Sequence, residues 1–117
     1  MESDYLTAVF LGTMGFIFWV GGRLFAKYPP KKINFWYGYR TRTSMKNQET
    51  WTYAQKIAAQ QMQQMGSYMV LCALGLSFFT FSMVWTLGIT LFSAILFPFW
   101  MLMVIERKLK KKFSSRE

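Results

Sequence analysis

A run of aromatic and cationic residues near the middle of the chain carries the side chains best suited to recognition chemistry. Four aromatic rings surround a glycine in the run Asn34-Phe-Trp-Tyr-Gly-Tyr, and Arg40 and Arg42 follow directly. A guanidinium stays charged and offers a planar fork for a phosphate, a carboxylate or the carbonyls of a helix end. Arg40 is therefore the first candidate for a ligand contact. The equally weighted alternative is a structural role, in which Arg40 holds the cytoplasmic ends of the spans or stacks with Trp36 or Tyr37.

The side chains that other kinds of site require are scarce. The chain has no His, a single Cys72 inside an apolar segment, and five acidic residues against 14 Lys and Arg. Acid-base, nucleophilic and metal chemistry each need such groups within reach of one another. The composition therefore predicts a protein that is not an enzyme, with no catalytic residues, no metal and no cofactor.

Two long uncharged stretches flank the aromatic run. Residues 5–22 and the 49 residues from 57 to 105 contain no charged side chain. One helix over the longer stretch would measure about 73 Å, against a hydrocarbon core of about 30 Å, so that stretch must fold back. We predict an all-α integral membrane protein with three transmembrane helices, near residues 5–25, 66–85 and 87–105. A tight turn over residues 85–88 would join the last two, with Trp85 at the interface.

The cationic residues predict the orientation in the membrane. Eight Lys and Arg lie between the two uncharged stretches, and the other six follow the second stretch. Short cytoplasmic segments collect Lys and Arg, so we expect a multi-pass protein of the bacterial cytoplasmic membrane with the N-terminus outside and the C-terminus cytoplasmic. Glu2 and Asp4 precede the first span, which indicates a retained helix rather than a cleaved signal.

The cationic C-terminal segment, residues 106–117, is predicted to be a basic tail. Retention on the cytoplasmic side and attraction to anionic lipid explain it. Nucleic acid is not an expected partner, because a run of six such residues offers no groove-reading fold.

Residues 26–65 are predicted to form an interfacial loop and a cytoplasmic-side amphipathic helix. Pro29 and Pro30 end the first helix, and a second should begin near residues 44–47, where Ser, Asn and Thr can cap it. The apolar positions recur at steps of three and four: Trp51, Ala54, Ala58, Met62 and Met65. This helix should lead directly into the second span, which makes residues 1–117 a single membrane domain.

Small residues also recur along one face of the first and second spans, including Gly12, Gly15, Gly22, Gly66 and Ala73. Such positions let two helix backbones approach closely. We favour packing within the chain over a homo-oligomer contact.

The run from Asn34 to Ala54 resembles the signature of the SdpI family of small bacterial membrane proteins. In that signature an Asn and a Gly-Tyr-Arg-Thr core precede a Met-Lys-Asn and a Trp followed by Ala. These elements stand at Asn34, residues 38–41, residues 45–47, Trp51 and Ala54. The resemblance covers essentially the whole chain and implies a three-span domain. Because the family is named for an immunity protein, it also implies protection against a secreted hydrophobic peptide toxin, and capture of a cytoplasmic repressor.

The candidate partner or ligand motif comprises Asn34, Trp36, Tyr37, Gly38, Arg40, Thr41, Arg42, Asn47 and Trp51. Within it, Gly38 is expected to serve the backbone, Thr41 and Asn47 to serve a turn and a cap, and Trp51 to pack or to anchor in the membrane.

Three functions remain open from the sequence. The leading hypothesis is protection against a hydrophobic antimicrobial peptide. The alternative is a membrane receptor or scaffold that recruits a cytoplasmic regulator through residues 34–54. A lipid-binding or small-solute module is the third, although the spans offer only Ser and Thr hydroxyls and no buried charge. The expected partners are the bilayer with its anionic lipids, and a toxin or a regulator.

Overall fold

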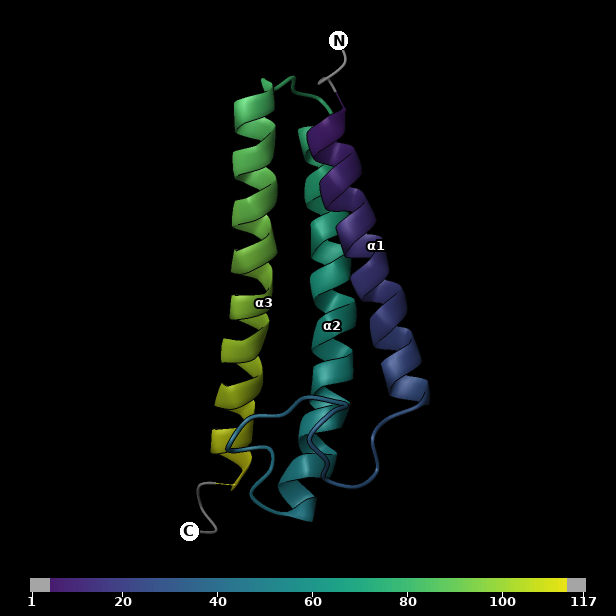
Figure 1. Ribbon diagram of the computed structural model, residues 1–117, viewed down its shortest axis with the longest axis vertical. Coiled ribbons are helices and arrows are strands. Elements are labelled where there is room, and N and C mark those ends of the chain that lie inside the picture. Colours follow the sequence, from purple (N-terminus) through teal and green to yellow (C-terminus); the bar gives the residue numbers. More distant parts are fainter. Residues whose placement is uncertain (1–4, 114–117) are drawn as a thin grey trace.

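Three helices make up the regular structure of the part of the chain that the structure describes (Figure 1). The computed structural model describes residues 5–113 and contains α1 (Leu6–Lys27), α2 (Gln48–Leu76) and α3 (Met83–Phe113). The helices run along the longest dimension of a body that measures 55 × 25 × 21 Å. We call the end with residues 28–47 the loop end and the end with residues 77–82 the hairpin end. Glu2, Asp4 and Arg116 lie outside the described residues.

Two of the helices, α1 and α3, are long and apolar enough to cross a membrane. Their large apolar side chains are mostly exposed, as in Phe16, Ile17, Phe92 and Ile95. Lipid is the environment in which such surfaces are stable. The fold is therefore all-α with three helices, two of which are candidate spans.

Helices α1 and α2 pack side by side through a glycine contact. A Cβ atom added to Gly15 would stand 2.7 Å from the Gly66 carbonyl oxygen, and one added to Gly66 would stand 2.5 Å from the Gly15 carbonyl oxygen. Further along, a Cβ on Gly12 would meet the Cβ of Ala73 at 3.4 Å. The small-residue seam is thus a contact within the chain, as predicted.

Helix α2 begins where the sequence predicted. The Asn47 side chain accepts a hydrogen bond of 2.9 Å from the Thr50 backbone N–H, and the Thr50 hydroxyl accepts one of 3.1 Å from the Asn47 N–H. This reciprocal pair satisfies two donors that a helix start leaves free. From there α2 continues without a break to Leu76, so the amphipathic segment and the following apolar segment form one helix.

The predicted turn over residues 85–88 is wrong. Helix α2 ends at Leu76 and α3 begins at Met83, so residues 77–82 make the connection and Trp85 lies in the first turn of α3. Ser82 directly precedes α3, and its carbonyl accepts from the Thr86 N–H at 2.9 Å. The buried Thr86 hydroxyl then accepts from the Thr7 hydroxyl at 2.9 Å. The connecting residues carry no charge, so the sequence pattern does not distinguish them from the predicted second span.

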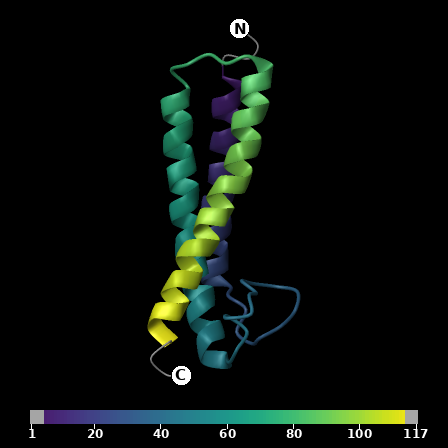
Figure 2. The same ribbon diagram turned by 90° about the vertical axis from the view of Figure 1, so that its left-hand side faces the viewer.

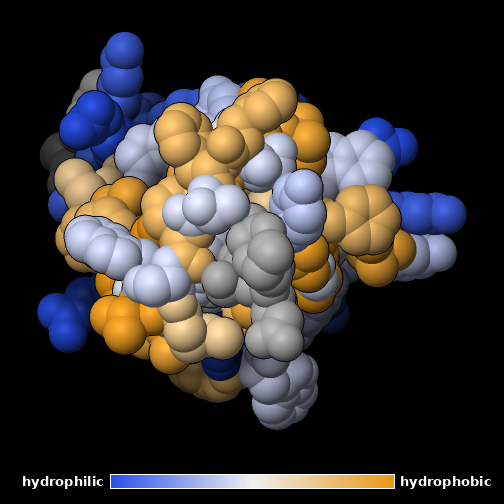
Figure 3. Space-filling view, turned by 90° about the horizontal axis from the view of Figure 1, so that it is seen from above, coloured by the Kyte–Doolittle hydropathy of each residue, from blue (hydrophilic) through white to orange (hydrophobic). Residues whose placement is uncertain are grey.

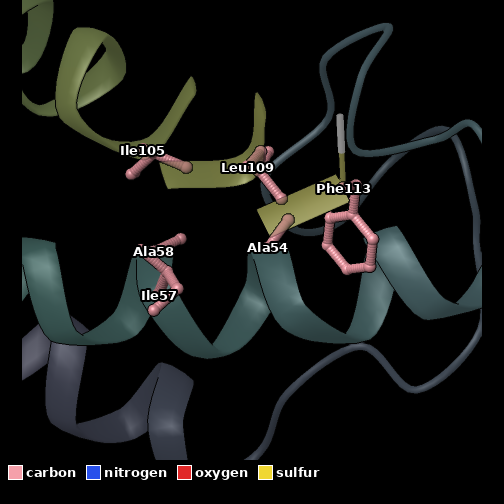
Figure 4. Packing of buried hydrophobic residues seen from close by; sticks show 6 residues of the cluster. All are labelled: Ala54, Ile57, Ala58, Ile105, Leu109 and Phe113. Carbon is pink, nitrogen blue, oxygen red and sulfur yellow. The ribbon is translucent and has the colours of Figure 1, made fainter. Parts of the chain in front are cut away.

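Helix α3 continues through most of the predicted basic tail, as far as Phe113. Ile105, Leu109 and Phe113 recur every four residues and are buried against α2. Their partners are Ala54, Ile57 and Ala58 (Figure 4). Residues 106–113 were predicted only as part of a basic tail, and the structure corrects this, because every fourth residue between the lysines is apolar and packs against α2.

Candidate functional site

The signature motif folds against the loop end of the helices (Figures 1 and 2). Asn34 shapes its first turn, because its side-chain oxygen accepts from the Trp36 N–H at 3.0 Å and the Tyr37 N–H at 2.7 Å. Asn side chains bond nearby backbone groups in this way in turns. The turn leaves Phe35 and Trp36 pointing away from the protein, with 80% and 85% of their surface exposed.

Tyr37 and Gly38 bring the chain back toward the helices. The Tyr37 hydroxyl donates to the Tyr28 carbonyl at 2.6 Å, and its ring meets the Phe25 ring edge-on with centroids 5.6 Å apart. Gly38 has φ of 110°, a conformation that other residues rarely adopt. A Cβ on Gly38 would also stand 2.6 Å from Pro30. Gly38 is therefore needed for the backbone, as expected.

The side chain of Gln55 holds the next peptide of the loop. Its amide oxygen accepts from the Tyr39 N–H at 2.7 Å, and its amide nitrogen donates to the Tyr39 carbonyl at 2.8 Å. Gln55 is only 2% exposed, so both of these bonds are shielded from water. Gln55 was not among the predicted site residues, because the spacing of polar residues along α2 does not indicate which backbone group an amide binds.

The side chain of Glu106 in α3 binds the same loop. Its Oε2 atom accepts hydrogen bonds from the Tyr39 hydroxyl at 2.6 Å and from the Thr41 hydroxyl at 2.8 Å. Burial and the neighbouring Glu106 carboxylate together raise the pKa of Tyr39 above its ordinary value of 10.0. We call Tyr39, Thr41, Gln55 and Glu106 the loop clamp.

A second set of bonds joins the clamp to the start of α2. The buried Ser44 hydroxyl accepts from the Thr41 N–H at 2.8 Å, and the Ser44 N–H donates to the Thr41 hydroxyl at 3.1 Å. The Thr50 hydroxyl lies 3.2 Å from the Ser44 carbonyl, to which it can donate. Thr41 and Asn47 thus occupy the turn and cap positions that their residue types suggested.

Trp51 fixes the proline segment to α2. Its side chain is fully buried, and its indole N–H donates to the Pro30 carbonyl at 2.7 Å. A buried indole with a satisfied donor is a packing residue. Of the two roles weighed for Trp51, the structure therefore shows packing.

Arg40 and Arg42 lie on the outside of the loop. Both are exposed, and within residues 5–113 neither makes a hydrogen bond, an ion pair or a ring contact. The bonds that hold the loop come from the clamp and from Ser44 and Trp51 instead. We call Phe35, Trp36, Arg40 and Arg42 the exposed loop surface. The motif thus divides into an internal clamp and an outward surface of two rings and two cations.

Comparison with known proteins places this motif in a family. The SdpI/YfhL protein family matches residues 31–104, which include all of the loop except its first three residues, all of α2 and most of α3. A relative from Bacillus subtilis (strain 168), described as "Uncharacterized protein YfhL", is 42% identical over 57 residues. That alignment covers 49% of this chain and 50% of the relative, so the chain spans about half the length of the curated relative it matches.

No solved structure matches the chain. The family match covers more than half of the chain and contains Tyr39, Thr41 and Gln55 of the clamp. The chain therefore belongs to the SdpI/YfhL protein family.

Proposed function

We propose that this SdpI/YfhL family membrane protein protects a bacterial membrane against a hydrophobic peptide toxin, by binding the toxin without any catalysis. The role is the one that the family resemblance implies. The observation that carries it here is the exposed aromatic surface of the hairpin end. A second candidate, recruitment of a cytoplasmic regulator, is supported by the exposed loop surface at the opposite end.

The proposal includes a topology with three membrane crossings. Helix α2 runs beside α1 along the glycine seam, so if α1 crosses the bilayer, the apolar half of α2 crosses with it. The Lys and Arg of the described residues belong to the segments 23–56 and 107–112. The positive-inside rule then puts the loop end in the cytoplasm and the hairpin end outside.

The hairpin end presents aromatic side chains to the outer interface. Phe78 is 86% exposed, Phe79 and Trp85 are also exposed, and the rings of Phe79 and Phe81 lie 6.4 Å apart. Figure 3 views the molecule from this end, where apolar side chains (orange) occupy much of the near face. A secreted peptide that enters the bilayer from outside meets this end first. Aromatic rings at such a boundary supply large contact areas at low entropic cost.

Helix α3 offers a further apolar face below the hairpin. Of its residues from Met83 to Val104, the structure buries only Thr86 and Ser93. Large side chains such as Leu91, Phe92 and Ile95 are exposed. A hydrophobic peptide can displace lipid from this face without separating α1 from α2. Toxin binding would therefore begin at the aromatic hairpin and continue along α3.

Survival of a toxin-sensitive bacterium tests the proposal. Cells producing the wild-type chain should survive a sporulation-delaying-type peptide, and the double variant Phe78→Ser/Phe79→Ser should lose this protection. The matched control is Phe35→Ser/Trp36→Ser, which removes two exposed rings from the opposite end and should still protect. Immunoblots of membrane fractions must show equal amounts of all three proteins.

Two results would contradict the proposal. If the wild-type chain is present in the membrane and gives no protection, immunity to this class of toxin fails. If the hairpin variant protects fully, the hairpin is not the toxin contact.

The second candidate function makes a separate prediction. Arg40 and Trp36 are both exposed in the loop at the proposed cytoplasmic face, and the clamp holds the neighbouring Tyr39, which suits capture of a soluble regulator. A photoreactive residue at position 36 should then crosslink to one cytoplasmic protein, and Arg40→Ala should abolish the product while Arg107→Ala leaves it. A product that persists in Arg40→Ala would exclude this use of the surface.

A further inference from the structure

A cavity of about 550 Å³ opens at the loop end, between the end of α1, the proline segment and the first half of α2. Its apolar wall includes Phe25, Ala26, Pro29 and Ala59. Two cationic residues, Lys31 and Lys56, line it as well. The volume is in the range of small-molecule sites, and an apolar wall beside a few charged groups is the usual composition of such sites.

Contacts with neighbouring side chains hold the walls of the cavity in place. The Pro30 carbonyl accepts from the Trp51 indole at 2.7 Å, and the Lys31 carbonyl accepts from the Gln48 side chain at 2.6 Å. On the α1 side, Phe25 rests against the ring of Tyr37. The cavity is therefore preformed, and a ligand would not have to pay for ordering the loop.

The charged residues that line the cavity, Lys31 and Lys56, are both cationic. No acidic residue lines it, and a second cavity of about 510 Å³ adjoins it at Ala26 and adds Arg23 and Lys27. Lys56 also borders a third cavity of about 560 Å³, where Glu49 and Lys112 bring charges of both signs. The first two hollows together thus place four cations beside apolar walls, a surface complementary to an anion with an apolar chain.

The level of the cavity along α1 indicates the source of that anion. The uncharged stretch of α1 ends at Gly22, and Arg23 and Lys27 follow toward the loop end. In the proposed topology this level is the cytoplasmic headgroup layer, where anionic lipids attract Lys and Arg. An amphiphile that lies in this layer can place its phosphate in the cavity while its chains remain in the bilayer.

We propose that these two adjoining cavities bind one anionic phospholipid. The phosphate lies between Lys31 and Lys56, and the upper part of an acyl chain lies against Phe25, Ala26 and Ala59. The hydroxyl of Thr52 and the amide of Gln60, which also line the cavity, can donate hydrogen bonds to the headgroup. The site is at the opposite end from the toxin surface, so it can fail while the proposed immunity function stands, and the reverse.

Photocrosslinking in vesicles tests the site. The full chain is reconstituted in phosphatidylcholine vesicles that contain phosphatidylglycerol with a photoreactive group near its headgroup. Crosslinks should map to residues 25–31 and 52–60. The yield should fall about fivefold for each of Lys31→Gln and Lys56→Gln, the scale of one cation near an anionic surface. The control Lys108→Gln removes one positive charge outside the cavity, as each test variant does inside it, and should leave the yield unchanged.

A steric variant gives independent evidence. Ala26→Trp should block the cavity and abolish the crosslink, whereas Ile17→Trp, on the exposed part of α1, should not. Circular dichroism checks that each variant remains helical.

Three outcomes would overturn the proposal. Equal crosslinking by photoreactive phosphatidylcholine would show an unselective lipid contact. Displacement by added inorganic phosphate would show a site for a soluble anion. Crosslinks that avoid residues 25–31 and 52–60 would place the lipid elsewhere.

Discussion

The Tyr39 hydroxyl donates a hydrogen bond of 2.6 Å to the Glu106 carboxylate, across 67 positions of the chain. This bond joins the loop between α1 and α2 to the final third of α3. Because Tyr39 is also bonded through its backbone to Gln55, the loop is held to two helices at one residue. The clamp thus fixes α3 relative to α2 near the loop end.

The coupling between Tyr39 and Glu106 should be measurable in a double-mutant cycle. Tyr39→Phe and Glu106→Gln should each lower the free energy of unfolding by about 1–3 kcal/mol, because a charge-assisted bond is lost or weakened in a partly buried place. Together they should be less than additive, with an interaction energy of about 0.5–3 kcal/mol. Denaturant unfolding in detergent micelles measures this, and simple additivity would show that the bond contributes no net stability.

Tyrosine titration should single out Tyr39. Burial and Glu106 raise the pKa of Tyr39 above 10.0, its ordinary and unfolded value. The folded state therefore keeps a proton that the unfolded state loses. The resulting stability contribution is fully present below pH 10.0 and is lost as the pH rises further, through the folded pKa.

Ultraviolet absorbance of tyrosinate gives the test. Of the six tyrosines, Tyr39 should ionise last, and Tyr39→Phe should remove that last step and flatten the alkaline loss of stability. Tyr5→Phe, at an exposed position, is the control. A last step that remains in Tyr39→Phe would assign the raised pKa to another tyrosine.

The glycine seam should tolerate no large side chain. Gly15→Leu should lower the free energy of unfolding by about 1–3 kcal/mol or more, because the Cβ atom of the new side chain would stand 2.7 Å from the Gly66 carbonyl oxygen. Gly75→Leu, also in a helix but with open space around its Cβ, should be neutral or stabilising. Thermal unfolding in micelles compares the two. Equal losses would mean that the helices do not approach closely at Gly15.

Labelling of single cysteines tests the topology. In a Cys72→Ser background, Thr80→Cys at the hairpin end should react with a membrane-impermeant maleimide in intact cells. Arg42→Cys at the loop end should react only after the cells are permeabilised, because the proposed topology, based on the positive-inside rule, has the loop end in the cytoplasm. The reverse pattern would invert the orientation, and labelling of both in intact cells would remove one crossing.

The end of α3 should behave as a core element. Leu109→Ala should cost about 2–5 kcal/mol of unfolding free energy, because Leu109 is fully buried against α2. Lys110→Ala, at the next position and exposed, should change it by no more than about 0.5 kcal/mol. Denaturant unfolding checks both, and a neutral Leu109→Ala would show that this part of α3 is a solvated tail.

The sequence was sufficient to predict the apolar helices and the N-terminal end of α2. Charge-free stretches predicted the apolar helices, and Asn47 with Thr50 supplied a cap that needs only local residues. The hairpin was misplaced because residues 77–82 lack charge and Gly88 suggested a turn. In the structure α3 begins directly after Ser82, and its first turn is bonded to α1 through Thr7 and Thr86. Sequence periodicity does not predict such a contact between distant residues.

The division of the motif into clamp and surface could not be predicted for the same reason. Arg40 has the most versatile side chain of the motif, yet it points outward, and Gln55 and Glu106 bind the loop instead. A lone Glu at the end of an apolar stretch is a recognisable sequence feature, because a carboxylate in such a place needs hydrogen-bond donors. Its donors, Tyr39 and Thr41, come from a segment far away in the chain, so only the fold identifies them.

The uninterrupted course of α2 has a geometric consequence. Its 29 residues form a rod of about 44 Å, which is longer than the hydrocarbon core of about 30 Å. Close contacts with α1 lie on both sides of Gly66, at Gln63 and at Ala73. If α2 crosses a bilayer beside α1, about 14 Å of this rod must therefore extend beyond the hydrocarbon core.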